Sequence, residues 1–149
     1  MATLKPSIGA LNTLTVTGLS TLASATYVLS NLIDVHSSTP WDIILQVEAA
    51  TTNTPSGNKQ LKIFIQETLD GTDFRTGPTS GTTTTREINL LALKALSITT
   101  TSTTERATYS LRQALGFVPY GAKVVFQNDL GVALTSATVK WAEVTMTIS

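Results

Sequence analysis

The sequence predicts an all-β fold, an antiparallel β-sandwich or jelly roll with one short helix. Threonine, a β-branched residue that favours strands, makes up 28 of the 149 residues. Apolar and polar side chains alternate over several stretches, and turn-forming residues separate these stretches about every 8–12 residues. The long helices that a parallel α/β sheet needs between its strands are missing from the pattern.

The first 24 residues differ in character from the rest of the chain. Residues 1–24 are rich in threonine, carry a single charged side chain at Lys5, and are predicted to be an N-terminal arm or a first strand. Within them, Leu14–Leu19 is a short predicted strand. Residues 25–149 are long enough to enclose one core and are predicted to form a single jelly-roll domain, with Ala25–Asp34 as its opening strand.

The clearest predicted strand is Trp41–Ala50, which Pro40 precedes at a position where a missing amide N–H does least harm. The loop Thr51–Asn58 leads to the next strand, Gln60–Thr68, and Asp70-Gly71 then supplies a turn. The residues expected to face the core are Trp41, Ile43, Leu45, Val47 and Ala49 of the first strand and Leu61, Ile63 and Ile65 of the second.

The middle of the chain is less regular. Gly77–Thr85 is a predicted surface loop, Arg86–Ala95 is ambiguous between a short helix and a strand, and Leu96–Thr101 is a predicted strand. The best helix candidate is Ala107–Leu115, because its last apolar residues recur at helical spacing and Gly116 supplies a stop.

Two further strands complete the prediction, Ala122–Asn128 and Thr138–Ile148. In the first, Ala122, Val124 and Phe126 share one face, which is expected to point inward. In the second, one face is more apolar than the other and is taken as inward. That face comprises Lys140, Ala142, Val144, Met146 and Ile148, opposite Val139, Trp141, Glu143, Thr145 and Thr147.

Charge and composition exclude several classes of function. Ten basic and ten acidic residues cancel, so no net field attracts nucleic acid or an anionic membrane, and neither is expected as a partner. Cysteine is absent, which excludes disulfides and thiolate metal sites, and no apolar run approaches a membrane span. A charged fraction of 13% is low for a soluble protein and suits a surface that docks to other proteins.

No residue pattern points to catalysis. His36 is the single histidine and has no cysteine to pair with. The acidic residues are dispersed, and the sequence does not decide whether two of them face each other across a cleft, as in a glycosidase. The two carboxylates of Asp70 and Asp73 fit a hairpin turn better than a calcium site. The chain is therefore predicted not to be an enzyme, with no catalytic residue, cofactor or metal site.

Five side chains are predicted to make contacts between proteins. Phe64 and Trp141 lie opposite the more apolar faces of their strands, so either both faces of the sheet are covered there or these two residues mark a subunit interface. Arg75, Arg86 and Arg112 are the other candidates, since arginine is common in protein interfaces and aromatic residues are too few for base stacking.

Several segments resemble tailed-phage capsid cement (decoration) proteins of jelly-roll type. They are Tyr109–Gly116, Val118-Pro119, Lys123–Leu134 and the strand and turn Ile65–Phe74. The resemblance implies a jelly roll made in the host cytoplasm and bound to the outer surface of the virion. Its partners would be the major capsid protein and further copies of itself, with a trimer favoured over a dimer.

Two alternatives remain open at this point. The chain could be another virion component, such as a tail or head-fibre base domain, which would occur in far fewer copies per particle. It could also be a carbohydrate-binding sandwich, which would require a row of exposed aromatic residues. Tyr27, Tyr120 and Trp141 are the candidates for that row.

Overall fold

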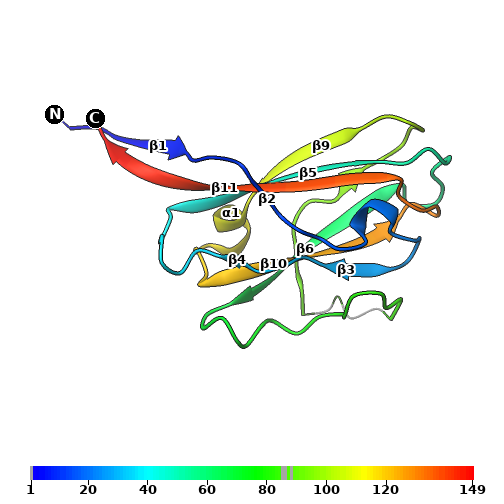
Figure 1. Ribbon diagram of the computed structural model, residues 1–149, viewed down its shortest axis with the longest axis horizontal. Helices are drawn as coiled ribbons and strands as arrows, with labels where there is room; N and C mark the ends of the chain where they lie inside the picture. Colours follow the sequence, from blue (N-terminus) through cyan, green and yellow to red (C-terminus); the bar gives the residue numbers. More distant parts are fainter. Residues whose placement is uncertain (1, 85–86, 88) are drawn as a thin grey trace.

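Two antiparallel sheets face each other in the computed structural model, which describes residues 2–84, 87 and 89–149 (Figure 1). In the first sheet, β1 (Leu4–Ile8), β11 (Ser136–Ile148), β5 (Asp42–Ala50) and β9 (Glu105–Ser110) lie in that order, and β2 (Asn12–Thr13) also pairs with β11. In the second sheet the order is β3 (Tyr27–Leu29), β10 (Gly121–Asp129), β6 (Gln60–Thr68) and β7 (Leu91–Ala92). There β4 (Ile33–Asp34) pairs with β10 and β8 (Leu96–Ser97) pairs with β6.

The strand order is that of a jelly roll. If β1 with β2, β3 with β4 and β7 with β8 are each counted as one interrupted strand, every sheet has four strands. In chain order, strands one, eight, three and six form the first sheet, and strands two, seven, four and five form the second. This is the double Greek key of a jelly roll, so the predicted fold class is confirmed.

The core lies between the sheets and is built from the alternating faces of the long strands. The inward residues predicted for β5 from Ile43 onward, for β6, and Phe126 of β10 are confirmed, since all are essentially inaccessible. The prediction for Trp41 is wrong, because its side chain is 44% exposed. Trp41 precedes β5 at the end of the sandwich, where the alternation continues but the covering layer does not.

The inward face of β11 is the opposite of the one predicted. In the register with β5, Val139 lies opposite Val47 and Trp141 opposite Leu45, so these two side chains face the core. The more apolar face of β11 lies on the outer side of the first sheet, where Ala142 and Val144 are nevertheless buried and Met146 and Ile148 are exposed. Alternation determines which residues share a face, but only the position of the second sheet determines which face is covered.

The helix is shorter than predicted. Helix α1 spans Leu111–Leu115, because the first residues of the predicted helix continue β9 as far as Ser110. Ser110 then caps α1, its Oγ accepting a hydrogen bond from the Gln113 amide at 3.0 Å. Gly116 ends the helix in the left-handed region, at φ 83°, as its sequence position predicted.

The other short elements differ from the prediction in extent. The segment predicted as a strand over Leu14–Leu19 is instead an irregular run into the 3-10 helix η1 (Leu19–Thr21), and its leucines pack into the core. The predicted Ala25–Asp34 strand is split into β3 and β4, and the predicted Leu96–Thr101 strand stops at Ser97. None of the described helices is long and apolar enough to cross a membrane.

A segment between β6 and β7 covers the outer face of the second sheet, below the sandwich in Figure 1. Phe64, Tyr27 and Val125 form a small buried cluster there, with Leu29 and Leu90 packed against it. Backbone bonds tie the segment to β3: the Tyr27 amide donates to the Thr82 carbonyl at 2.9 Å. Both faces of the second sheet are therefore covered at Phe64.

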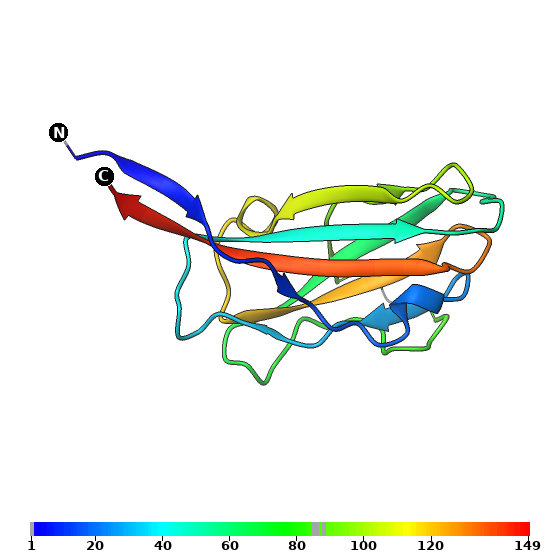
Figure 2. The ribbon, with the colours of Figure 1, turned by 45° about the horizontal axis from the view of Figure 1, so that its top comes forward.

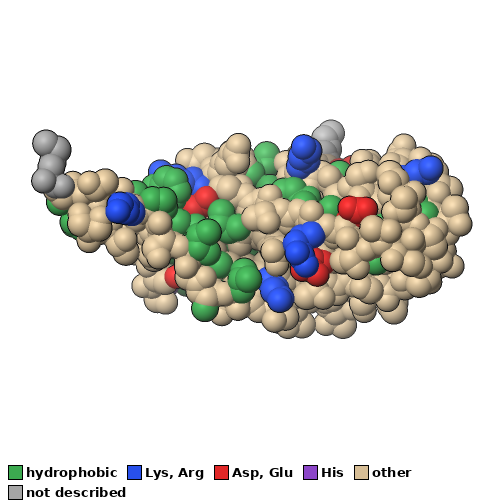
Figure 3. Space-filling view, turned by 90° about the horizontal axis from the view of Figure 1, so that it is seen from above, with side chains coloured by type: hydrophobic (Ala, Val, Ile, Leu, Met, Phe, Trp, Pro, Cys, Tyr) green, Lys and Arg blue, Asp and Glu red, His purple; other side chains and the backbone are tan. Residues whose placement is uncertain are grey.

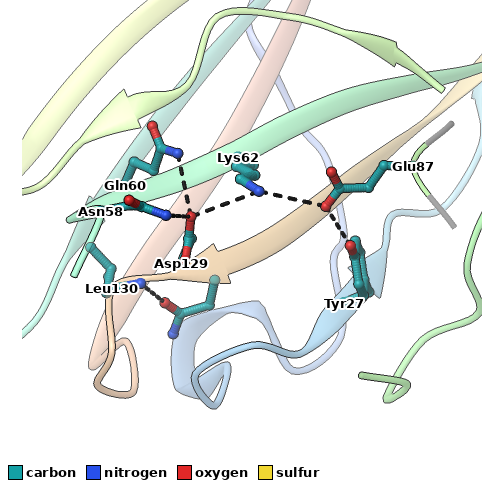
Figure 4. A network of polar contacts seen from close by, with 8 residues as sticks. Tyr27, Asn58, Gln60, Lys62, Glu87, Asp129 and Leu130 are labelled. Carbon is teal, nitrogen blue, oxygen red and sulfur yellow. Dashed lines mark hydrogen bonds and ion pairs between the residues drawn. The ribbon is translucent and has the colours of Figure 1, made fainter. Parts of the chain in front are cut away.

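A polar network fastens the same segment to the sheet (Figure 4). The Tyr27 hydroxyl donates a hydrogen bond to Glu87, and Lys62 of β6 lies 3.7 Å from both Glu87 and Asp129. Asn58 donates to Asp129 at 2.7 Å. These contacts link the covering segment, β6 and β10. They also give Lys62, Glu87 and Asp129 oppositely charged partners within the chain.

Candidate interaction surface

A two-stranded ribbon projects from one end of the sandwich. It consists of β1 and the last residues of β11, which run beyond the point where β5 begins (Figures 1 and 2). Thr3 and Ser149 exchange two backbone hydrogen bonds of 3.1 Å, so the strands are paired to the tip. The two ends of the chain consequently lie side by side there.

The ribbon has one apolar and one polar face. Residues directly opposite each other in an antiparallel pair share a face. The pairs Leu4 with Ile148, Pro6 with Met146 and Ile8 with Val144 therefore form an apolar face. The pairs Lys5 with Thr147 and Ser7 with Thr145 form the polar face.

The apolar face is uncovered along most of its length. Ile148 is 75% exposed, Ile8 67%, Leu4 61% and Met146 37%, and nearby Leu11 is also exposed. In the view of Figure 3, hydrophobic side chains gather where the ribbon joins the body, and few of them are seen at the opposite end. Such a concentration of large aliphatic groups on one end is typical of a protein-binding surface.

The ribbon also has free strand edges. β1 pairs only with β11 among the described strands, and the part of β11 beyond Val144 pairs only with β1. An isolated two-stranded ribbon is marginally stable in water, and unpaired edges invite further strands. The ribbon thus combines an uncovered apolar face with unused backbone donors and acceptors.

The base of the ribbon is held by a buried carboxylate. Asp42 is 4% exposed and accepts hydrogen bonds from the Ser110 hydroxyl at 2.5 Å and from the Arg112 amide at 2.9 Å. This fixes α1 against β5. The Arg112 guanidinium then lies 4.7 Å from the centre of the Trp41 ring and donates to the Trp41 carbonyl at 2.8 Å. The Trp41 amide in turn donates to the Val144 carbonyl at 2.8 Å, next to the ribbon.

The sequence-predicted contact residues do not gather at one place. Phe64 is buried within the chain, and Trp141 is partly buried against the core. Arg112 lies at the ribbon base, whereas Arg75 lies on the second sheet, and Arg86 is outside the described residues. Of these residues, Arg112 alone is placed beside the ribbon.

The arginines are engaged with partners of the same chain. Arg75 forms a bidentate ion pair with Glu67, its Nε lying 2.7 Å from Oε2, and it donates to the Asn89 carbonyl at 2.9 Å. Burial raises the pKa of Glu67, but the hydrogen bond and charge of Arg75 outweigh this and leave the pKa lowered. Arg106 of β9 pairs with Glu48 at 2.7 Å. The sandwich therefore does not gather these arginines into a basic patch.

The residues considered as catalytic or metal-binding candidates make contacts that stabilise the fold. His36 stacks on Tyr120, with ring centroids 4.2 Å apart. The Asp70 carboxylate accepts hydrogen bonds from the amides of Thr72 and Asp73, each at 2.8 Å, which lower its pKa to about 2. Asp70 thus stabilises the predicted turn after β6. No group of three or more His, Asp or Glu side chains converges anywhere in the described part of the chain.

An open groove of about 610 Å³ lies between β9 and the segment Ala92–Ala95. Its lining is mostly alanine and hydroxyl-bearing side chains, with Lys94 the one charged residue among them. Tyr109 borders it, and burial raises the pKa of its hydroxyl, which lacks a hydrogen-bond partner, to about 12. The three candidates for a carbohydrate-binding row do not form one, since Tyr27 is fully buried, Tyr120 stacks on His36 and Trp141 packs against the core.

The sequence contained a signal for the ribbon that the strand prediction did not use. Leu4, Pro6 and Ile8 alternate with Lys5 and Ser7, which is the period of a half-covered strand. The pairing of this stretch with the end of β11 required the structure. Neither any protein-family model nor any of the curated proteins compared matches this chain.

Proposed function

We propose that this protein decorates the outer surface of a bacteriophage capsid and stabilises it by bridging neighbouring subunits of the major capsid protein. The observation that carries the proposal is the β1–β11 ribbon, a projection that offers other chains both an apolar face without cover and free strand edges. A jelly-roll body with such a projection is suited to adhesion between proteins. The resemblance of the segments around Ile65–Phe74 and Lys123–Leu134 to phage cement proteins supports the same role.

The mechanism is repeated burial of surface across subunit boundaries. A single interface of standard size buries about 1,600 Å² in total. On a closed shell the same contact recurs at every symmetry-related position. Binding to the assembled shell and not to its free subunits stabilises the assembled state by mass action. The protein therefore needs no chemistry at its surface, only a rigid body and adhesive patches.

The test mixes the purified protein with expanded capsids that lack it. We expect the protein to sediment with these capsids and to raise the temperature at which they come apart. Capsids that already carry their full complement are the matched control and should bind no more. Protein that stays in the supernatant with bare capsids would refute the proposal. Copy number then separates the two virion roles, because a cement protein occupies every equivalent shell position and a tail component only a few.

A further inference from the structure

We propose that the apolar face of the β1–β11 ribbon packs against the same face of a second copy of this chain and builds a homo-oligomer. The apolar face comprises Leu4, Pro6, Ile8, Met146 and Ile148, with Val144 at its base. The inference identifies the surface through which copies join, and it rests on the proposed function only for what the oligomer then does on a capsid.

The chemistry of the face favours an identical partner. No charged side chain lies on it, and the ribbon's cation, Lys5, lies on the polar face with Ser7 and two threonines. Charges and buried polar groups are what give a contact between different proteins its register and selectivity. A face without them is self-complementary: two copies bury their aliphatic groups together while both polar faces stay in water.

The size of the face fits a contact between copies. The exposed parts of its side chains amount to roughly 500 Å², at the upper end of what a monomer leaves uncovered. A standard interface covers about 800 Å² on each partner, so the ribbon supplies most of one side.

The geometry of the ribbon allows this contact without disturbing the sandwich. The ribbon projects beyond the body (Figure 2), which leaves room for a second ribbon beside it. Sheet faces pack about 10 Å apart with their side chains interdigitating. Joining the copies through the apolar face leaves the strand edges of both ribbons unpaired, so that one oligomer can touch several capsid subunits and gain avidity.

The experiment compares one negative charge on each face of the ribbon. Ile8→Asp places it on the apolar face, and Ser7→Asp places it on the polar face of the same strand, one residue away. Both residues are exposed, so neither change affects the core. The mass of each purified variant is measured by light scattering after gel filtration, and circular dichroism and thermal unfolding check that each variant is folded.

We expect the wild type and Ser7→Asp to have a multiple of the 15.8 kDa chain mass, and Ile8→Asp to fall to the single-chain mass. Leu4→Asp should behave like Ile8→Asp. A monomeric wild type, or equal effects of the two Asp variants, would overturn the inference. Capsid sedimentation is scored separately: an oligomer that depends on the ribbon and ignores capsids refutes the proposed function alone, and a monomer that binds capsids refutes the self-contact alone.

Discussion

Replacement of Asp42 tests whether a buried carboxylate holds α1 and the ribbon base together. Its two oxygens accept hydrogen bonds from the Ile43 amide at 2.7 Å, the Arg112 amide at 2.9 Å and the Ser110 hydroxyl at 2.5 Å. Asp42→Ala removes both acceptor oxygens, and with them the bonds from two amides and one hydroxyl. Asp42→Asn keeps one oxygen and nearly the same volume.

The expected magnitudes follow from these contacts. A hydrogen bond to a charged group contributes about 1.5–3 kcal/mol, and bonds that share one acceptor group are not additive. We therefore expect Asp42→Ala to lower the free energy of unfolding by about 3–5 kcal/mol. Asp42→Asn should lower it by about 1–2 kcal/mol, because one oxygen still accepts the amide bonds.

Urea unfolding followed by circular dichroism and tryptophan fluorescence measures both values. Protein concentration is kept constant, because the stability of an oligomer depends on it. The emission of folded Asp42→Ala should also change, since release of α1 moves the Arg112 guanidinium off the Trp41 ring. Asp73→Ala, at an exposed carboxylate, is the control and should stay within about 0.5 kcal/mol of wild type. A loss below about 1 kcal/mol for Asp42→Ala, or equal losses for the Asn and Ala variants, would show that this carboxylate does not hold α1 in place.

Four further predictions follow from positions elsewhere in the sandwich. Phe64→Ala should lower stability by about 3–5 kcal/mol and leave the oligomer mass unchanged, whereas a lower mass at full stability would identify Phe64 as a contact residue. The pKa of Asp70 is about 2 in the folded protein against an ordinary 3.8. Ionised Asp70 therefore stabilises the folded state above pH 4, and this stabilisation is lost as the pH falls toward 2. Asp70→Asn should remove that part of the acid loss in urea unfolding, and an unchanged acid profile would contradict this. Because the pKa of Tyr109 is raised to about 12 in the folded protein, the neutral hydroxyl favours the folded state fully below pH 10. This part of the free energy of unfolding is lost between pH 10 and 12. Tyr109→Phe should abolish the latest tyrosine step in an ultraviolet titration with little loss of stability, and a late step that persists would assign it to another tyrosine. Gly131→Ala should destabilise the fold by about 1–3 kcal/mol, because φ is 71° and the new Cβ would lie 2.0 Å from the Ser56 hydroxyl oxygen; a calorimetric melting temperature equal to wild type would rule out this clash.

The long strands were predictable because their alternation is set by the chain itself. β6 has its predicted bounds, β5 begins one residue later than predicted, and β10 is one residue longer at each end. Three inward residues of β6, from Leu61 to Ile65, were identified for the same reason. When one face of a strand is covered, the alternation of apolar and polar residues in its sequence identifies which residues lie on that face.

What surrounds a strand was not predictable in this way. Phe64 is covered by a segment without any regular period, which the bond between its Glu87 and Tyr27 of β3, 60 residues away in sequence, holds in place. Trp41 continues the pattern of β5 but lies beyond the opposing sheet. In both cases the deciding contact is made by residues far away in sequence, so no local pattern contains it.

The ribbon was missed for a related reason. The apolar face of β11 was taken as inward because globular strands usually bury their more apolar side. Here Val144, Met146 and Ile148 belong instead to the face that they share with β1. A surface that awaits another molecule has the same composition as a core, and sequence patterns do not separate the two.

The pairing of Leu4 with Ile148 sets the order in which the molecule matures. These residues are separated by almost the whole chain, so the contact carries a large loop-closure cost and depends on synthesis of the final strand. A nascent chain emerges from the ribosome with its first strand unpaired and closes the ribbon only after Ile148 has been added. Chains that lack residues 144–148 consequently lose the partner strand of β1 and with it the apolar face of the ribbon.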